Sequence, residues 1–141
     1  MTRRLRRVAH SVFIDAPVEM YIFWLSYFAF GWGLILFIHT SRYTNFSTYR
    51  VFREFGFEPY IWLLIYTGIS LFGFYACLNG ARQVVRVASM LMFILWLFTT
   101  VALFIPNMTV NTGTFVYTTF SLVGGYIYVR VSNNSFQGLW S

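Results

Sequence analysis

Three long stretches of the chain carry no charged residue, and this feature constrains the fold more than any other. They cover residues 20–38, 60–78 and 87–105, each 19 residues long. At about 1.5 Å of rise per residue, a helix of that length covers about 28 Å, close to the hydrocarbon thickness of a bilayer. Only 10% of the residues are charged, against about 25% in a typical soluble domain. The sequence therefore predicts a membrane protein.

A fourth stretch, residues 114–131, is also long enough to cross a bilayer, although threonine and serine dilute its hydropathy. Its small and hydroxyl residues recur at steps of four and three, which places them on one helical face: Thr114, Thr118, Ser121, Gly125 and Tyr128. Such a face favours packing against other helices, because small residues allow close approach and hydroxyl groups find partners there. Lining of a pore is the alternative interpretation. We expect an all-α membrane protein with four transmembrane helices.

The chain divides into three parts within one structural unit. Residues 1–16 form a basic segment, residues 17–131 the four-helix transmembrane domain, and residues 132–141 a polar tail. In the first part, apolar residues recur with the period of a helix between arginines, which predicts an amphipathic helix in the membrane interface. Its arginine-rich, acid-free composition is also typical of a mitochondrial import segment. A bacterial N-terminus with its positive charge on the inner side is the alternative.

All ten basic residues are arginines, and their placement predicts orientation. With the N-terminus on the inner side, seven arginines lie inside and three outside, so we expect both termini on the inner side. Because the arginines flank apolar stretches, their expected ligands are anionic phospholipids such as cardiolipin rather than nucleic acid. The expected headgroup-binding residues are Arg3, Arg4, Arg6, Arg7, Arg82, Arg86 and Arg130.

Small residues spaced four apart mark positions where helices can approach closely. The pairs expected to mediate helix packing are Ala29 with Gly33, Gly73 with Cys77, and Ser121 with Gly125. Cys77 is also the only cysteine, which excludes an intrachain disulfide. In the long first loop, the pattern of residues 47–55 predicts a short interfacial helix that ends at Gly56. Phe52 and Phe55 on this helix could equally form a docking surface for a partner.

The sequence displays no chemistry for catalysis or ion coupling. Its apolar stretches contain no Asp, Glu, His, Lys or Arg before Arg130, whereas pumps and coupled transporters place such residues within the membrane. The two histidines, His10 and His39, are expected on opposite sides of the bilayer, which excludes joint ligation of a haem. No nucleophile–base pair, phosphate loop or metal spacing is present. We expect no catalytic, cofactor-binding or metal-binding residue and no small-molecule substrate.

These patterns favour a noncatalytic accessory subunit of a larger membrane complex, which acts in assembly, helix packing and anionic-lipid binding alongside other membrane subunits. The import-like N-terminus favours the mitochondrial inner membrane, within a respiratory-chain complex or ATP synthase. A bacterial cytoplasmic membrane is the alternative location. The alternative function is a self-associating pore former, such as a bacteriophage holin or a small channel.

Overall fold

The structure is a computed structural model of the chain that describes residues 18–79, 81–108 and 112–133. The basic segment with Arg3, Arg4, Arg6 and Arg7, and nearly all of the predicted tail, lie outside these residues. Every regular element within them is a helix. In chain order these are α2 (Val18–Ile38), α3 (Thr40–Asn45), η2 (Ser47–Tyr49), α4 (Arg50–Glu54), α5 (Pro59–Asn79), α6 (Arg82–Asn107) and α7 (Thr112–Ser132).

Among the described residues, three helices are long and apolar enough to cross a membrane: α2, α5 and α6. They correspond to the three charge-free stretches of the sequence. The helix α7 has 21 residues, as many as α2 and α5, but its hydroxyl-rich sequence is less hydropathic and it does not join this group. The chain is thus an all-helical protein whose three apolar helices are consistent with integral insertion in a membrane.

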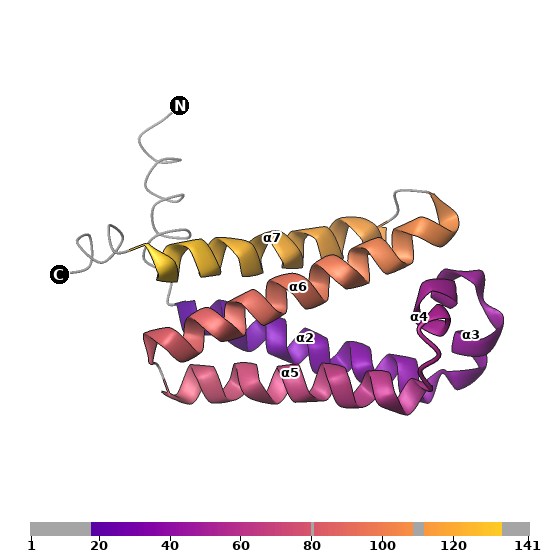
Figure 1. Cartoon of the computed structure of the whole chain (residues 1–141), viewed down its shortest axis with the longest axis horizontal. Coiled ribbons are helices and arrows are strands. Elements are labelled where there is room, and N and C mark those ends of the chain that lie inside the picture. The colour runs from indigo at the N-terminus through magenta and orange to yellow at the C-terminus, as the bar shows by residue number, and fades with distance from the viewer. Residues whose placement is uncertain (1–17, 80, 109–111, 134–141) are drawn as a thin grey trace.

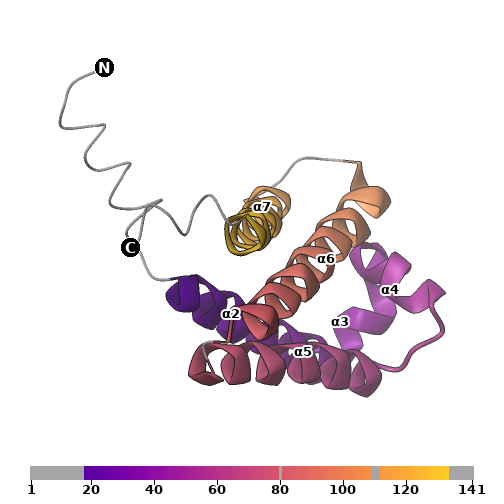
Figure 2. The same ribbon diagram turned by 60° about the vertical axis from the view of Figure 1, so that its left-hand side comes forward.

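The long helices form two antiparallel pairs. α2 and α5 lie side by side along most of their length, and α6 packs in the same way with α7 (Figure 1). α6 also contacts α5 and so joins the two pairs, while α7 lies on the side of α6 that faces away from α5 (Figure 2). This arrangement leaves α2 and α7 in limited contact with each other.

The helix α6 extends beyond the apolar stretch at both ends. It begins at Arg82 rather than at residue 87, so Arg82 and Arg86 are helical and not part of a loop. Arginine is a good helix former, and its long side chain can carry its charge away from an apolar surface. At the other end the helix continues through Pro106 and its last residue is Asn107. Met108 caps it with a positive φ of 46°, and its N–H donates to the Phe104 carbonyl.

The short helices α3, η2 and α4 fold over the end of the bundle at which α5 begins (Figure 1). The helix predicted for residues 47–55 is present as η2 and α4, and Gly56 follows it with a φ of +69°. Its two phenylalanines do not form a shared exposed surface, however. Phe52 is fully buried and its ring meets Trp62 edge-on at 5.0 Å, whereas Phe55 is exposed. The expected docking pair is therefore wrong for Phe52, because the apolar end of the bundle covers that ring.

Candidate functional site

The contact between α2 and α5 is built on two glycines. A Cβ atom on Gly33 would lie 2.9 Å from the Cβ of Tyr66, and one on Gly73 would overlap the Ser26 hydroxyl. Ser70 donates from its hydroxyl to the Ser26 carbonyl at 2.7 Å, which ties the two helices together across this close approach. Ala29 is fully buried in the bundle core. The helices meet where a larger side chain would push them apart.

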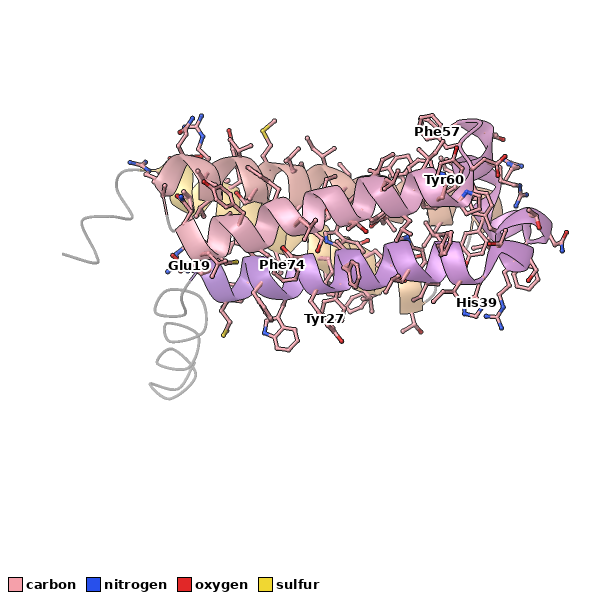
Figure 3. The ribbon with its side chains drawn as sticks, turned by 90° about the horizontal axis from the view of Figure 1, so that it is seen from below. Glu19, Tyr27, His39, Phe57, Tyr60 and Phe74 are labelled. Atoms are coloured by element: carbon pink, nitrogen blue, oxygen red, sulfur yellow. The ribbon has the colours of Figure 1, made fainter. Side chains whose placement is uncertain are left out.

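Cys77 lies in the last turn of α5, beside the start of α2. Its thiol is partly buried, and Sγ is 3.2 Å from the backbone carbonyl of Glu19 at the start of α2. Glu19 marks this end of the bundle, and His39 the opposite end of α2 (Figure 3). The thiol thus contacts the neighbouring helix backbone as a small, weakly polar side chain does.

The contact between α6 and α7 is equally close. A Cβ atom on Gly124 would lie 2.9 Å from the backbone nitrogen of Phe93, and one on Gly125 would lie 3.2 Å from the Phe93 ring. Ser121 donates to the Phe93 carbonyl at 3.3 Å. Sequence spacing singled out Ser121 and Gly125 but missed Gly124, although this residue makes the closest backbone approach. The adjacent pair of glycines was the available signal, since either one could face α6.

The hydroxyl stripe of α7 is divided between the interior and the surface. Thr114 and Ser121 are buried, whereas Thr118 is exposed. The hydroxyl of Thr118 donates to the Thr114 carbonyl at 2.7 Å, and that of Ser121 crosses to α6. These groups are satisfied by backbone carbonyls, which is the usual arrangement of hydroxyl residues at helix contacts.

One end of the bundle gathers the three described arginines of the predicted lipid-binding set. Arg82 and Arg86 lie at the start of α6 and Arg130 near the end of α7. Arg82 donates from Nε to the Val131 carbonyl at 2.8 Å and from Nη2 to the Ser132 carbonyl at 3.0 Å. Arg130 is buried rather than exposed. Arg82 is thus exposed but engaged in contacts with the end of α7, whereas Arg86, in the second turn of α6, is half-buried.

A buried hydroxyl pair links α5 to α6. The Tyr66 hydroxyl lies 2.6 Å from the Thr99 hydroxyl, and Thr99 in turn donates to the Leu95 carbonyl at 2.8 Å. Both residues are fully buried. Since Thr99 uses its proton on Leu95, Tyr66 is the donor to Thr99. Within the described ranges, no group of three His, Cys, Asp or Glu side chains is arranged to hold a metal ion.

The short helices α3, η2 and α4 form an end cap on the bundle, which is held by hydrogen bonds around Tyr43 on α3. Its hydroxyl donates to the Phe57 carbonyl at 2.8 Å and accepts from the indole nitrogen of Trp62 at 3.0 Å. Arg53 donates to the carbonyls of Tyr43 and Phe46, with the latter at 2.8 Å. Burial raises the pKa of Tyr43 above its usual value of 10.0. The cap is thus closed by neutral hydrogen bonds and a guanidinium group bound to backbone oxygens.

A cavity of about 260 Å³ lies between α2, α6 and α7, where α2 and α7 are in limited contact. Aromatic rings form most of its walls, namely those of Tyr27, Phe28, Trp32, Trp96, Tyr117 and Phe120. No sequence pattern indicated this cavity, because its walls come from three different helices. Its only local signal was the face of α2 that carries Phe28, Gly31, Trp32 and Ile35 at steps of three and four.

Comparisons of the chain with models of known protein families, with curated proteins and with solved structures found no match. The class of the protein therefore rests on its own sequence and fold, which define an all-helical protein with three helices able to cross a membrane.

Proposed function

We propose that the chain is a noncatalytic accessory subunit that packs against other membrane-embedded subunits of a larger complex. The observation that carries this proposal is an aromatic surface on α2, formed by Phe23, Trp24, Tyr27 and Phe28, all of them exposed. Tyr27 points away from the bundle (Figure 3), with 54% of its surface exposed. Large aromatic side chains are enriched where proteins meet and supply much of the binding energy there.

The rings of this surface contact one another rather than standing alone. The centroids of Phe23 and Trp24 are 5.6 Å apart, those of Trp24 and Tyr27 5.9 Å, and those of Tyr27 and Phe28 5.8 Å. Edge-to-face contacts of this kind hold the rings in defined positions. A fixed aromatic surface loses little side-chain freedom on binding, which favours a protein partner over fluid lipid chains.

The proposal includes four membrane-spanning helices with both termini on the inner side. Support for the fourth comes from α7, which matches α2 and α5 in length and packs antiparallel to α6. Support for the orientation comes from Arg82, Arg86 and Arg130, which share one end of the bundle. With the four arginines of the basic segment, this end would attract the anionic headgroups of an inner leaflet, such as those of cardiolipin.

The proposed location is the mitochondrial inner membrane, in a respiratory-chain complex or ATP synthase. It rests on the arginine-rich, acid-free composition of residues 1–16. Fusion of these residues to a fluorescent protein tests it, since import into mitochondria is expected and should be lost when the four arginines are replaced by glutamine. Failure of the wild-type fusion to enter mitochondria would instead favour a bacterial cytoplasmic membrane.

Site-specific photo-cross-linking in the native membrane tests the accessory-subunit proposal. A photoreactive phenylalanine analogue at Trp24 should give adducts with a different, larger protein chain. The same analogue at Leu71, which is 61% exposed on α5, serves as the matched control and should give mainly lipid adducts. The full-length chain should also migrate within a large assembly on native gels.

Two outcomes would contradict this proposal. Equal lipid adducts at both positions would leave the aromatic surface facing the bilayer without a protein partner. Adducts made only of multiples of this chain, together with leakage from reconstituted liposomes, would favour the self-associating pore former. In that case replacement of Thr118 and Ser121 by leucine should abolish the leakage.

A further inference from the structure

The cavity between α2, α6 and α7 has the size of a binding site for a small ring compound. A cavity of about 150 Å³ with apolar walls holds one benzene molecule, whereas this cavity has about 260 Å³. Among its lining residues, Tyr27 and Phe28, near the middle of α2, and Ile35, in its last turn, are also exposed on the surface of that helix. The cavity thus opens sideways, at a depth where α2 would face lipid chains, and a ligand would enter from the lipid phase.

The walls of the cavity are flat rings in defined orientations. Trp96 and Tyr117 lie parallel within 7° at a centroid distance of 5.6 Å, and Phe28 stacks on Phe120 at 4.8 Å. Trp32 contacts Tyr117 from α2 at 5.0 Å. Flat aromatic walls present most contact area to a flat ligand, since rings stack face to face with an offset or meet edge to face.

One wall also carries a polar group without a partner. Trp96 is 1% exposed, and its indole nitrogen has no hydrogen-bond partner among the described residues. Buried N–H groups are nearly always hydrogen-bonded in proteins, so each exception calls for an explanation. The indole nitrogen of Trp32 also lacks a bond of normal geometry, but it neighbours the Tyr66 hydroxyl. The indole nitrogen of Trp96 is thus the donor that is left for a ligand.

Gly31 on α2 keeps part of the cavity open. It lines the cavity, and a Cβ atom built on it would meet no other atom within 4 Å. Gly33 on α2 and Gly73 on α5 differ, because the close approach of these two helices leaves no room for a side chain at either position. Helix packing thus explains those two glycines but not Gly31, whose missing side chain leaves space inside the cavity.

We propose that this cavity binds a flat, uncharged ring compound that carries a carbonyl oxygen and reaches the site through the lipid phase. The ring would lie against the aromatic walls, and the Trp96 indole N–H would donate to the carbonyl oxygen. No charged side chain lines the cavity, which excludes an ionic ligand because an unpaired charge is costly to bury. Tyr27 and Phe28 belong both to this cavity and to the aromatic surface proposed to bind another subunit, so the proposal concerns the single chain, in which that surface faces lipid.

The test uses the full-length chain in phosphatidylcholine nanodiscs and two tritiated probes of the same shape. One is 2,3-dimethyl-1,4-naphthoquinone, whose substituted ring does not add to thiols, and the other is 2,3-dimethylnaphthalene, which lacks the carbonyls. Binding is measured as the saturable excess over empty nanodiscs. Trp96→Phe should weaken quinone binding about 2- to 10-fold, the usual effect of one lost hydrogen bond, and leave hydrocarbon binding unchanged.

Gly31→Leu should fill the cavity and abolish saturable binding of both probes. Gly68→Leu is its matched control, because Gly68 is a glycine inside α5 that is equally open but does not line the cavity. Circular dichroism and the Tm of each variant establish that it remains folded. Absence of saturable binding to the wild type, or binding that survives Gly31→Leu, would overturn the site. Equal weakening of both probes by Trp96→Phe would overturn the role of the indole N–H.

Discussion

Arg82 at the first residue of α6 donates through Nε to the carbonyl oxygen of Val131 near the end of α7, at 2.8 Å. A second bond, from Nη2 to Ser132, satisfies another carbonyl in the last turn of the same helix. The last carbonyls of a helix have no partner within the helix and carry its negative dipole end. A guanidinium group there both satisfies these oxygens and opposes the dipole, so Arg82 closes the end of α7 across 49 residues of sequence.

Arg82→Gln should therefore loosen the last turn of α7. The loss is about 1 kcal/mol, because the side chain is exposed and its charge is partly screened. Hydrogen exchange measured by mass spectrometry should become faster in the peptide that ends α7 and remain unchanged in α5. The control is Arg50→Gln, which removes only the exposed pair with Glu54 and should leave α7 unaffected. Unchanged exchange in Arg82→Gln would mean that the two bonds do not hold the helix end.

Replacement of glycine by alanine should have opposite effects at a glycine packed against a neighbouring helix and at an open one. Gly124→Ala should destabilise the protein by about 1–3 kcal/mol, since the new Cβ meets the Phe93 backbone, which cannot move aside as a side chain can. Gly68→Ala should be neutral or stabilising by up to about 1 kcal/mol, because alanine favours the helix and the position is open. Equilibrium unfolding in detergent micelles measures both changes. A loss of stability in both variants would point to glycine flexibility rather than close packing.

The sequence predicted those features that depend on neighbouring residues along the chain. The three apolar helices followed from charge-free stretches, and the end of α4 followed from Gly56. The partner of Arg82 could not be predicted, because backbone carbonyls carry no signature in the sequence. The choice of Gly124 over Gly125 depends on the rotation of α7 against α6, and the cavity depends on how three helices diverge. Such features arise from tertiary packing, which one-dimensional patterns do not encode.

The Tyr66–Thr99 pair predicts that removal of its two hydroxyls will have unequal effects. Tyr66→Phe removes a donor and leaves Thr99 bonded to the Leu95 carbonyl, so the cost should be close to the average of about 0.6 kcal/mol for such bonds in membrane proteins. Thr99→Val leaves the fully buried Tyr66 hydroxyl without its acceptor and should cost about 1–3 kcal/mol.

Unfolding of both single variants and the double variant in micelles measures these costs. The double variant should be no less stable than Thr99→Val, because the second substitution removes the unpaired group. Strictly additive losses would show that the two hydroxyls do not act as a pair.

The hydrogen bonds of Tyr43 predict that the end cap loosens at high pH. Burial raises the pKa of Tyr43 in the folded protein above the value of 10.0 expected for the unfolded chain. The stability that depends on the neutral phenol is therefore complete below pH 10 and is lost as the pH rises toward and through the raised value. Ionisation would remove the proton donated to the Phe57 carbonyl, while the bond accepted from Trp62 could persist.

Fluorescence of Trp62, isolated by replacing the other four tryptophans with phenylalanine, should report this change as the pH rises above 10. The matched variant Tyr43→Phe lacks the titrating group and should show the loosened cap at neutral pH with no further transition of this kind. Tyr49 is a half-buried neighbour whose ring stacks on Tyr43 at 6.2 Å. The variant Tyr49→Phe controls for loss of a phenol alone and should retain the transition. If Tyr43→Phe titrates as the wild type does, another group controls the cap.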